Sequence, residues 1–198
     1  MKLYTKIFFL INYCFTIINY TFVESYNMKP VRLVARVLYY VSLVLCFFYT
    51  LAGLYVAYAT ITRSSSFKLI EDGKKFMVSA PFGERPYFIG DNYTGYMVQM
   101  VSLLLLYGLF FWLLSQVFKV FTQKKLFTQT GINHLQRFYL ANLIIPGVAY
   151  ILLLVTNEEA EDVFMLVMLH AVIGVFAYFI AAIFKQGVLL QNEQDLYI

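Results

Sequence analysis

The residues of this chain that could do chemistry are few and far apart. Its two histidines are His134 and His170, and its two cysteines, Cys14 and Cys46, both lie in apolar runs. The chain contains no G-x-x-x-x-G-K-[ST], G-x-G-x-x-G, H-E-x-x-H or C-x-x-C motif. These are the usual local signatures of phosphate, dinucleotide and zinc sites. We therefore expect no catalytic residue, no cofactor and no metal, and we do not expect an enzyme.

The carboxylates give no acid–base pair either. Four of them gather in the short segment TNEEAED: Glu158, Glu159, Glu161 and Asp162. Such a cluster is typical of a solvated acidic turn. The long apolar segments contain no Asp or Glu, so the carboxylate relay used by many pumps and transporters is missing.

The composition points to a membrane protein. Hydrophobic residues make up 61% of the 198 residues and charged residues 13%, against about 45–50% and about 25% in soluble domains. The mean hydropathy is +0.71. A soluble fold of this size could not bury so much apolar surface. An ordinary cytosolic enzyme, a disordered regulator and a disulfide scaffold are excluded.

Four apolar segments have about the length that a helix needs to cross a bilayer. They cover residues 37–61, 96–118, 138–155 and 163–184. None has the one-sided apolar stripe of a soluble helix. The sequence therefore predicts an all-α integral membrane protein with four transmembrane helices in a membrane domain over residues 28–198, and the lipid bilayer as its first partner.

His170 is the titratable residue inside these spans. Ionisable groups within a membrane are candidate functional sites. A neutral imidazole can also join two helices through a hydrogen bond. We take His170 as a candidate intramembrane polar site and leave both interpretations open. Its candidate hydrogen-bond partners are Gln99, Ser102, Gln116 and Asn142.

Lysine and arginine in the flanks predict the orientation, because they are retained on the cytoplasmic side. Eight of them fall on one side of the predicted bundle and five on the other. The first set is Lys29, Arg32, Arg36, Lys119, Lys124, Lys125, Arg137 and Lys185; the second is Arg63, Lys68, Lys74, Lys75 and Arg85. Both termini are therefore predicted to be cytoplasmic.

The loop between the first two spans has β-strand signals. Residues 67–70 and 74–79 are short β-prone runs joined by Glu71-Asp72-Gly73, a typical hairpin connection. Residues 87–89 supply a third short run. We predict a small hairpin-like extracytoplasmic unit, which is either a cap for a ligand or a simple connector.

The first 27 residues do not fit the four-span arrangement. Residues 7–23 form a further apolar run, but no small-x-small cleavage site follows it. A fifth span, or cleavage, would place Lys29, Arg32 and Arg36 on the wrong side. We expect Met28 to be the physiological start and residues 1–27 to be a mis-called extension or an extra apolar segment.

The loop and the tail on the basic side contain the more specific sequence. Thr128 or Thr130 is expected to cap the third helix. After residue 184, either the fourth helix continues or the chain turns at Gly187 and folds back on Phe127. We expect the turn, with Val188, Leu189 and Leu190 packed on the loop near Leu126 and Phe127. Glu193 or Asp195 would then pair with Lys124, Lys125 or Arg137.

Two segments resemble a known family. KKLFTQTGINHLQRF is similar to its G-x-x-F-T-x-x-N-x-x-x-L-R-x-I pattern, and IFKQGVLLQNEQDLYI is similar to I-F-x-x-G-x-x-L-x-x-E-x-D-L-T-I. The family is the bacterial domain of unknown function 2975, and the resemblance covers residues 28–198. It implies a bacterial inner-membrane protein, often encoded beside a small helix-turn-helix regulator, with no known reaction.

The functional hypothesis is a non-catalytic accessory or sensor that engages a cytoplasmic helix-turn-helix regulator. The alternative is a small transporter or permease subunit, and a membrane enzyme has least support. Direct nucleic-acid binding is not expected, and a homo-oligomer is left open. The candidate partner-binding residues lie in the loop and the tail: Phe127, Thr128, Leu135, Arg137, Gly187, Leu190, Glu193, Asp195 and Leu196.

Overall fold

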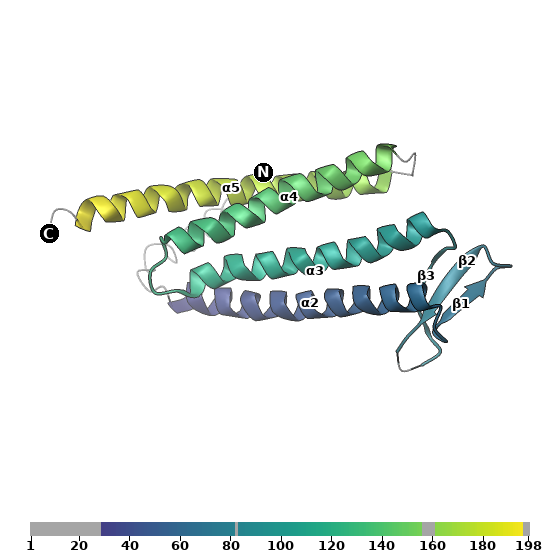
Figure 1. Ribbon diagram of the computed structural model, residues 1–198. Coiled ribbons are helices and arrows are strands. Elements are labelled where there is room, and N and C mark those ends of the chain that lie inside the picture. Colours follow the sequence, from purple (N-terminus) through teal and green to yellow (C-terminus); the bar gives the residue numbers. More distant parts are fainter. Residues whose placement is uncertain (1–28, 82, 156–160, 196–198) are drawn as a thin grey trace, which may run out of the picture.

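The computed structural model describes residues 29–81, 83–155 and 161–195 (Figure 1). Three sequence-based expectations fall at least partly outside these residues. They concern the segment 1–27 with its start at Met28, the acidic turn with Glu158 and Glu159, and the candidate contact residue Leu196.

The described residues form four long helices: α2 (Lys29–Thr62), α3 (Thr94–Thr122), α4 (Gln129–Val155) and α5 (Glu161–Asp195). All four are long and apolar enough to cross a membrane, which confirms the predicted class and the four predicted spans. The described helices extend past the apolar segments, most of all at the start of α4 and the end of α5. Hydropathy finds the part of a helix that lies in hydrocarbon, whereas the backbone hydrogen bonds continue into the headgroup region and beyond.

The helices are arranged as two hairpins, α2 with α3 and α4 with α5, and α3 also contacts α4 (Figure 1). Small side chains let the helices of the first hairpin approach closely, as is usual in membranes. The buried face of α2 is made of Ala35, Ser42, Gly53, Val56 and Ala59.

A three-stranded antiparallel sheet lies at one end of the α2–α3 hairpin (Figure 1). Its strands are β1 (Phe67–Ile70), β2 (Lys75–Ser79) and β3 (Pro86–Asp91), in the order β1-β2-β3. This confirms the predicted hairpin and third run. The β1–β2 turn contains Gly73 at φ +83°, a value that glycine adopts without strain.

The sheet is attached to the hairpin by its own apolar face. Phe76 and Val78 of β2 are buried against Val56, Ala59 and Met97 of the helices. In addition, the Tyr55 hydroxyl donates a hydrogen bond of 2.7 Å to the Ser79 carbonyl. The unit is therefore fixed to α2 and α3.

The other end of the molecule has a packed core shared by α3, α4 and α5. We call it the inner core, and it lies between the middle of the bundle and the end opposite the sheet. Its buried residues are Leu113, Val117, Val120, Ile132, Leu135, Phe138, Ala177, Ala181 and Phe184.

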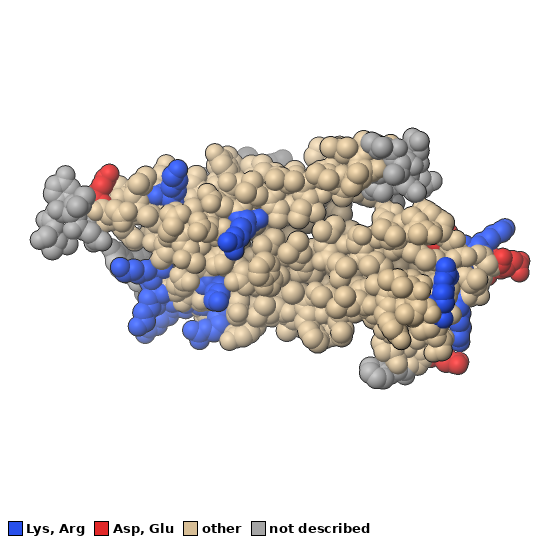
Figure 2. Space-filling model, viewed as in Figure 1, with Lys and Arg blue, Asp and Glu red and all other residues tan. Residues whose placement is uncertain are grey.

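Charged side chains divide the surface into three zones (Figure 2). A wide belt between the ends shows almost none, as expected for a surface in contact with lipid. Lysine and arginine gather toward the end opposite the sheet, which we call the basic end, whereas both signs mix at the sheet end (Figure 2). This distribution follows from the sequence positions of the two sets of bases.

Candidate functional site

Between the middle of the bundle and the sheet end, a cavity of about 660 Å³ separates α3 from the α4–α5 hairpin. It lies above the inner core, where the packing of the three helices ends. The lining runs from Thr94 at the start of α3 to Leu113, and across α4 from Ala141 to Leu152. Val163, Leu166 and His170 of α5 complete it. Nothing in the sequence analysis predicted this cavity.

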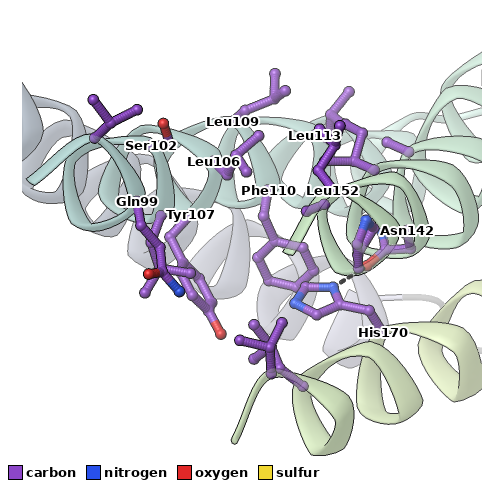
Figure 3. Close-up of a pocket in the computed structure, with 18 of the residues that line it drawn as sticks. Gln99, Ser102, Leu106, Tyr107, Leu109, Phe110, Leu113, Asn142, Leu152 and His170 are labelled. Atoms are coloured by element: carbon purple, nitrogen blue, oxygen red, sulfur yellow. Dashed lines mark hydrogen bonds between the residues drawn. The ribbon is translucent and has the colours of Figure 1, made fainter. Parts of the chain in front are cut away.

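His170 lies at the deep end of the cavity and is hydrogen-bonded to α4 (Figure 3). Its Nδ1 is 2.7 Å from the Asn142 Oδ1. The Asn142 Nδ2 donates to the Phe138 carbonyl at 2.8 Å, so the amide oxygen is the atom that faces the imidazole. Because this oxygen can only accept, Nδ1 carries the proton.

The structure thus selects one of the four partners expected for His170. Asn142 bonds it, whereas the Gln116 amide donates to the Ser115 hydroxyl at 3.2 Å. Gln99 and Ser102 line the cavity instead. The other three candidates do not bond His170, since side-chain direction around a helix decides which polar groups meet.

Aromatic rings surround His170 and connect it to the first hairpin. The rings of Phe110 and Tyr107 in α3 lie 5.2 Å and 6.0 Å from the imidazole, centroid to centroid. Tyr107 also stacks on Tyr49 of α2 at 5.5 Å. A chain of rings therefore joins α2, α3 and α5 in the middle of the bundle, with His170 at its end.

Several polar groups on the cavity wall have no hydrogen-bond partner among the described residues. They include the Gln99 amide, the Tyr107 hydroxyl and the Nε2 of His170, which is directed away from Asn142 (Figure 3). Gln99 and Tyr107 extend from the same side of α3 as Phe110 (Figure 3). The sequence analysis overlooked Tyr107, because one tyrosine among 17 has no distinguishing signal.

At the basic end, the two segments that resemble the family patterns pack against each other. The Phe127 ring lies 5.3 Å from that of Phe184, edge to face. A Cβ built on Gly187 would come within 2.5 Å of the Phe127 ring. The predicted turn at Gly187 was therefore wrong: α5 continues through it, and the glycine lets the ring approach the helix backbone.

Two further candidate residues also have structural roles here. The Thr128 hydroxyl accepts a hydrogen bond of 3.1 Å from the Gly131 backbone, which confirms the predicted cap of α4 at Thr128. Leu135 is fully buried in the inner core. Phe127, Thr128, Leu135 and Gly187 thus build the basic end.

The remaining described candidates stay at the surface. Arg137, Leu190 and Glu193 are exposed, and Leu190 keeps 61% of its accessible surface. The prediction that Leu189 and Leu190 pack back on the loop was wrong, because both are exposed. Of the three apolar tail residues expected to pack, Val188 does so, against the inner core. Among the described ion pairs, none joins Glu193 to a base of the loop. Asp195 is the last residue of α5.

Within the described residues, no group of three or more His, Cys, Asp or Glu is placed to hold a metal ion. The site is therefore characterised by its shape, its apolar walls and a few polar groups.

The family model for "Protein of unknown function (DUF2975)" matches residues 52–198. The chain belongs to the DUF2975 family. The match begins later than the resemblance expected from residue 28, and it includes both basic-end segments, the cavity and the sheet. Comparisons with curated proteins and with solved structures found no match.

Proposed function

We propose that this DUF2975 protein is a non-catalytic sensor or accessory protein of the bacterial cytoplasmic membrane. In this proposal the basic end faces the cytoplasm and docks a helix-turn-helix regulator, the partner that the family resemblance implies. The observation that carries the proposal is the built platform at the basic end. Phe127 and Gly187 fasten the loop to α5, and the helix then continues two turns past Gly187 with exposed Leu190 and Glu193.

The orientation rests on the distribution of charge. Lys29, Lys124, Lys125 and Lys185 are exposed at or near the basic end, and few acids accompany them. The sheet end has five bases against Glu71, Asp72, Glu84 and Asp91. Because basic residues are retained in the cytoplasm, the platform would be accessible to a soluble regulator.

A small transporter or permease subunit is the second candidate, with less support. The cavity enters only one half of the bundle, and the inner core fills the space between α3, α4 and α5 in the other half. Flux of a solute through liposomes that contain only this protein would favour transport.

The proposal is tested by co-expression with a helix-turn-helix regulator of the kind that the family resemblance implies, taken from beside the gene of this protein. We expect the full chain, solubilised and purified by affinity, to retain the regulator. A chain that ends after Val188 should lose it, because this truncation removes the exposed end of α5 with Leu190 and Glu193 and leaves Gly187 and Val188 in place. Lys68→Glu at the sheet end is the control and should retain the regulator. Equal retention by the truncated chain would contradict the proposal.

A further inference from the structure

The cavity contains polar groups that the bilayer cannot satisfy. The side chain of His170 is buried, with 8% of its surface exposed, yet its Nε2 has no partner among the described residues. Gln99 and Tyr107 also turn unpaired polar groups to this space (Figure 3). Acyl chains cannot form hydrogen bonds, so an unpaired polar group in hydrocarbon is strongly unfavourable. The site therefore favours an occupant with a polar group of its own.

The walls indicate the charge of that occupant. The described lining residues include no Lys, Arg, Asp or Glu. A charged group would stay uncompensated in an apolar surrounding, which is costly. A neutral polar group is therefore favoured.

The protonation of His170 indicates which polar group fits. Since Nδ1 donates to Asn142, the Nε2 of the neutral ring is an acceptor and needs a donor. The Gln99 amide and the Tyr107 hydroxyl can each donate to an acceptor. A hydroxyl does both, because it donates one hydrogen bond and accepts others. The volume of about 660 Å³ is within the usual range for a small-molecule site.

We propose that the cavity binds a neutral, hydroxyl-bearing amphiphile of the monoacylglycerol type. Its hydroxyl head interacts with His170, Tyr107 and Gln99, and its chain lies along the leucine side chains of the lining. This inference rests on the proposed sensor function, because the amphiphile would be the signal that the protein detects. Its test is separate, because ligand binding can fail while capture of the regulator persists.

The experiment measures saturable binding of radiolabelled 1-monooleoylglycerol to the full chain in phosphatidylcholine nanodiscs. Methyl oleate, which lacks a hydroxyl, and oleate, which has a charged head, are the matched competitors. We expect both to compete at least tenfold more weakly than unlabelled monooleoylglycerol. Equal competition by methyl oleate would mean adventitious binding of acyl chains only and would overturn the proposal. Stronger competition by oleate would overturn the neutral head group.

Two variants locate the site. Tyr107→Phe removes only the hydroxyl and should weaken binding about three- to tenfold, the effect of one hydrogen bond. Ala149→Phe places a large ring in the cavity and should abolish binding. Tyr178→Phe, an exposed tyrosine on α5 outside the lining, is the control and should bind as the parent does. Parental affinity in both Tyr107→Phe and Ala149→Phe would overturn the proposal, and Tyr107→Phe keeps the test valid if the larger substitution prevents folding.

Discussion

Asn142 joins two helices with one side chain. Its amide oxygen accepts from His170 of α5, and its amide nitrogen donates to the Phe138 carbonyl of its own helix. Asn142 and His170 are both buried. The sequence alone identified His170 as a candidate site, because it is the one His, Lys, Arg, Asp or Glu in the four predicted spans. It could not show which of four polar residues bonds it, since that depends on the rotation of each helix.

Asn142→Leu is expected to lower the free energy of unfolding by about 1–2 kcal/mol, because the buried Nδ1–H of His170 loses its acceptor. Unfolding in mixed micelles measures the change. The double variant Asn142→Leu/His170→Phe should lose less than the sum of the single variants, because neither partner is then left unpaired. Gln129→Leu is the control. It removes an exposed hydrogen bond from the Gln129 side-chain amide to the Asn133 side chain, and we expect the free energy of unfolding to change by about zero. Strict additivity would contradict the account.

Replacing Gly187 by alanine would have two opposite effects on stability, one from helix propensity and one from packing. In a plain helix, Gly→Ala stabilises by up to about 1 kcal/mol. Here the added Cβ would meet the Phe127 ring at 2.5 Å. We expect Gly187→Ala to lower the free energy of unfolding by about 1–3 kcal/mol through overpacking. Thermal unfolding in detergent measures this, with the exposed Gln186→Ala as control. A more stable Gly187→Ala protein would mean that the close contact is unimportant.

At the scale of elements, the sequence predicted the helices and the sheet but placed some boundaries wrongly. Apolar run length and the Asp72-Gly73 pair are local signals, so four helices and a hairpin could be inferred. The course of the tail was different. A glycine after an apolar run favours a turn when read locally, whereas packing of Phe127 against Gly187 and Phe184 lets α5 continue.

The continuing helix changes what is expected of the tail. Val188 packs against the inner core, and Leu190 is exposed. We expect Val188→Asp to lower the free energy of unfolding by about 2 kcal/mol or more, because it buries an unpaired charge. Leu190→Asp should change it by less than about 0.5 kcal/mol. Unfolding in mixed micelles measures the free energy of unfolding of both variants. If Leu190→Asp were the more destabilising, Leu190 would have to be packed against the loop and the account would be contradicted.

At the scale of the whole molecule, the cavity arises from how the two hairpins meet. The helices of the α4–α5 hairpin share the inner core with α3, and the helices separate toward the sheet end. The cavity could not be predicted from the sequence, because it depends on how the helices are placed relative to one another. The spacing of residues within one helix gives no information on that placement. The charge zones could be predicted, because they follow from sequence position alone.

The orientation can be measured with single cysteines in a background of Cys14→Ser and Cys46→Ser. We expect a membrane-impermeant maleimide to label Gly83→Cys on intact cells, because the proposed orientation places the sheet end outside. Lys125→Cys should be labelled only after permeabilisation. The reverse pattern would place the platform outside the cytoplasm and remove the basis for regulator docking.

The central claim is that the exposed end of α5 contacts a cytoplasmic regulator, and photo-crosslinking in living cells tests it most directly. A benzophenone side chain is introduced at Leu190 and, as the matched control, at Ile61 near the sheet end, which is also apolar and is more exposed. The account predicts a covalent adduct with the regulator from position 190 and none from position 61. No adduct at 190 in cells that contain both proteins, or equal adducts at both positions, would contradict it.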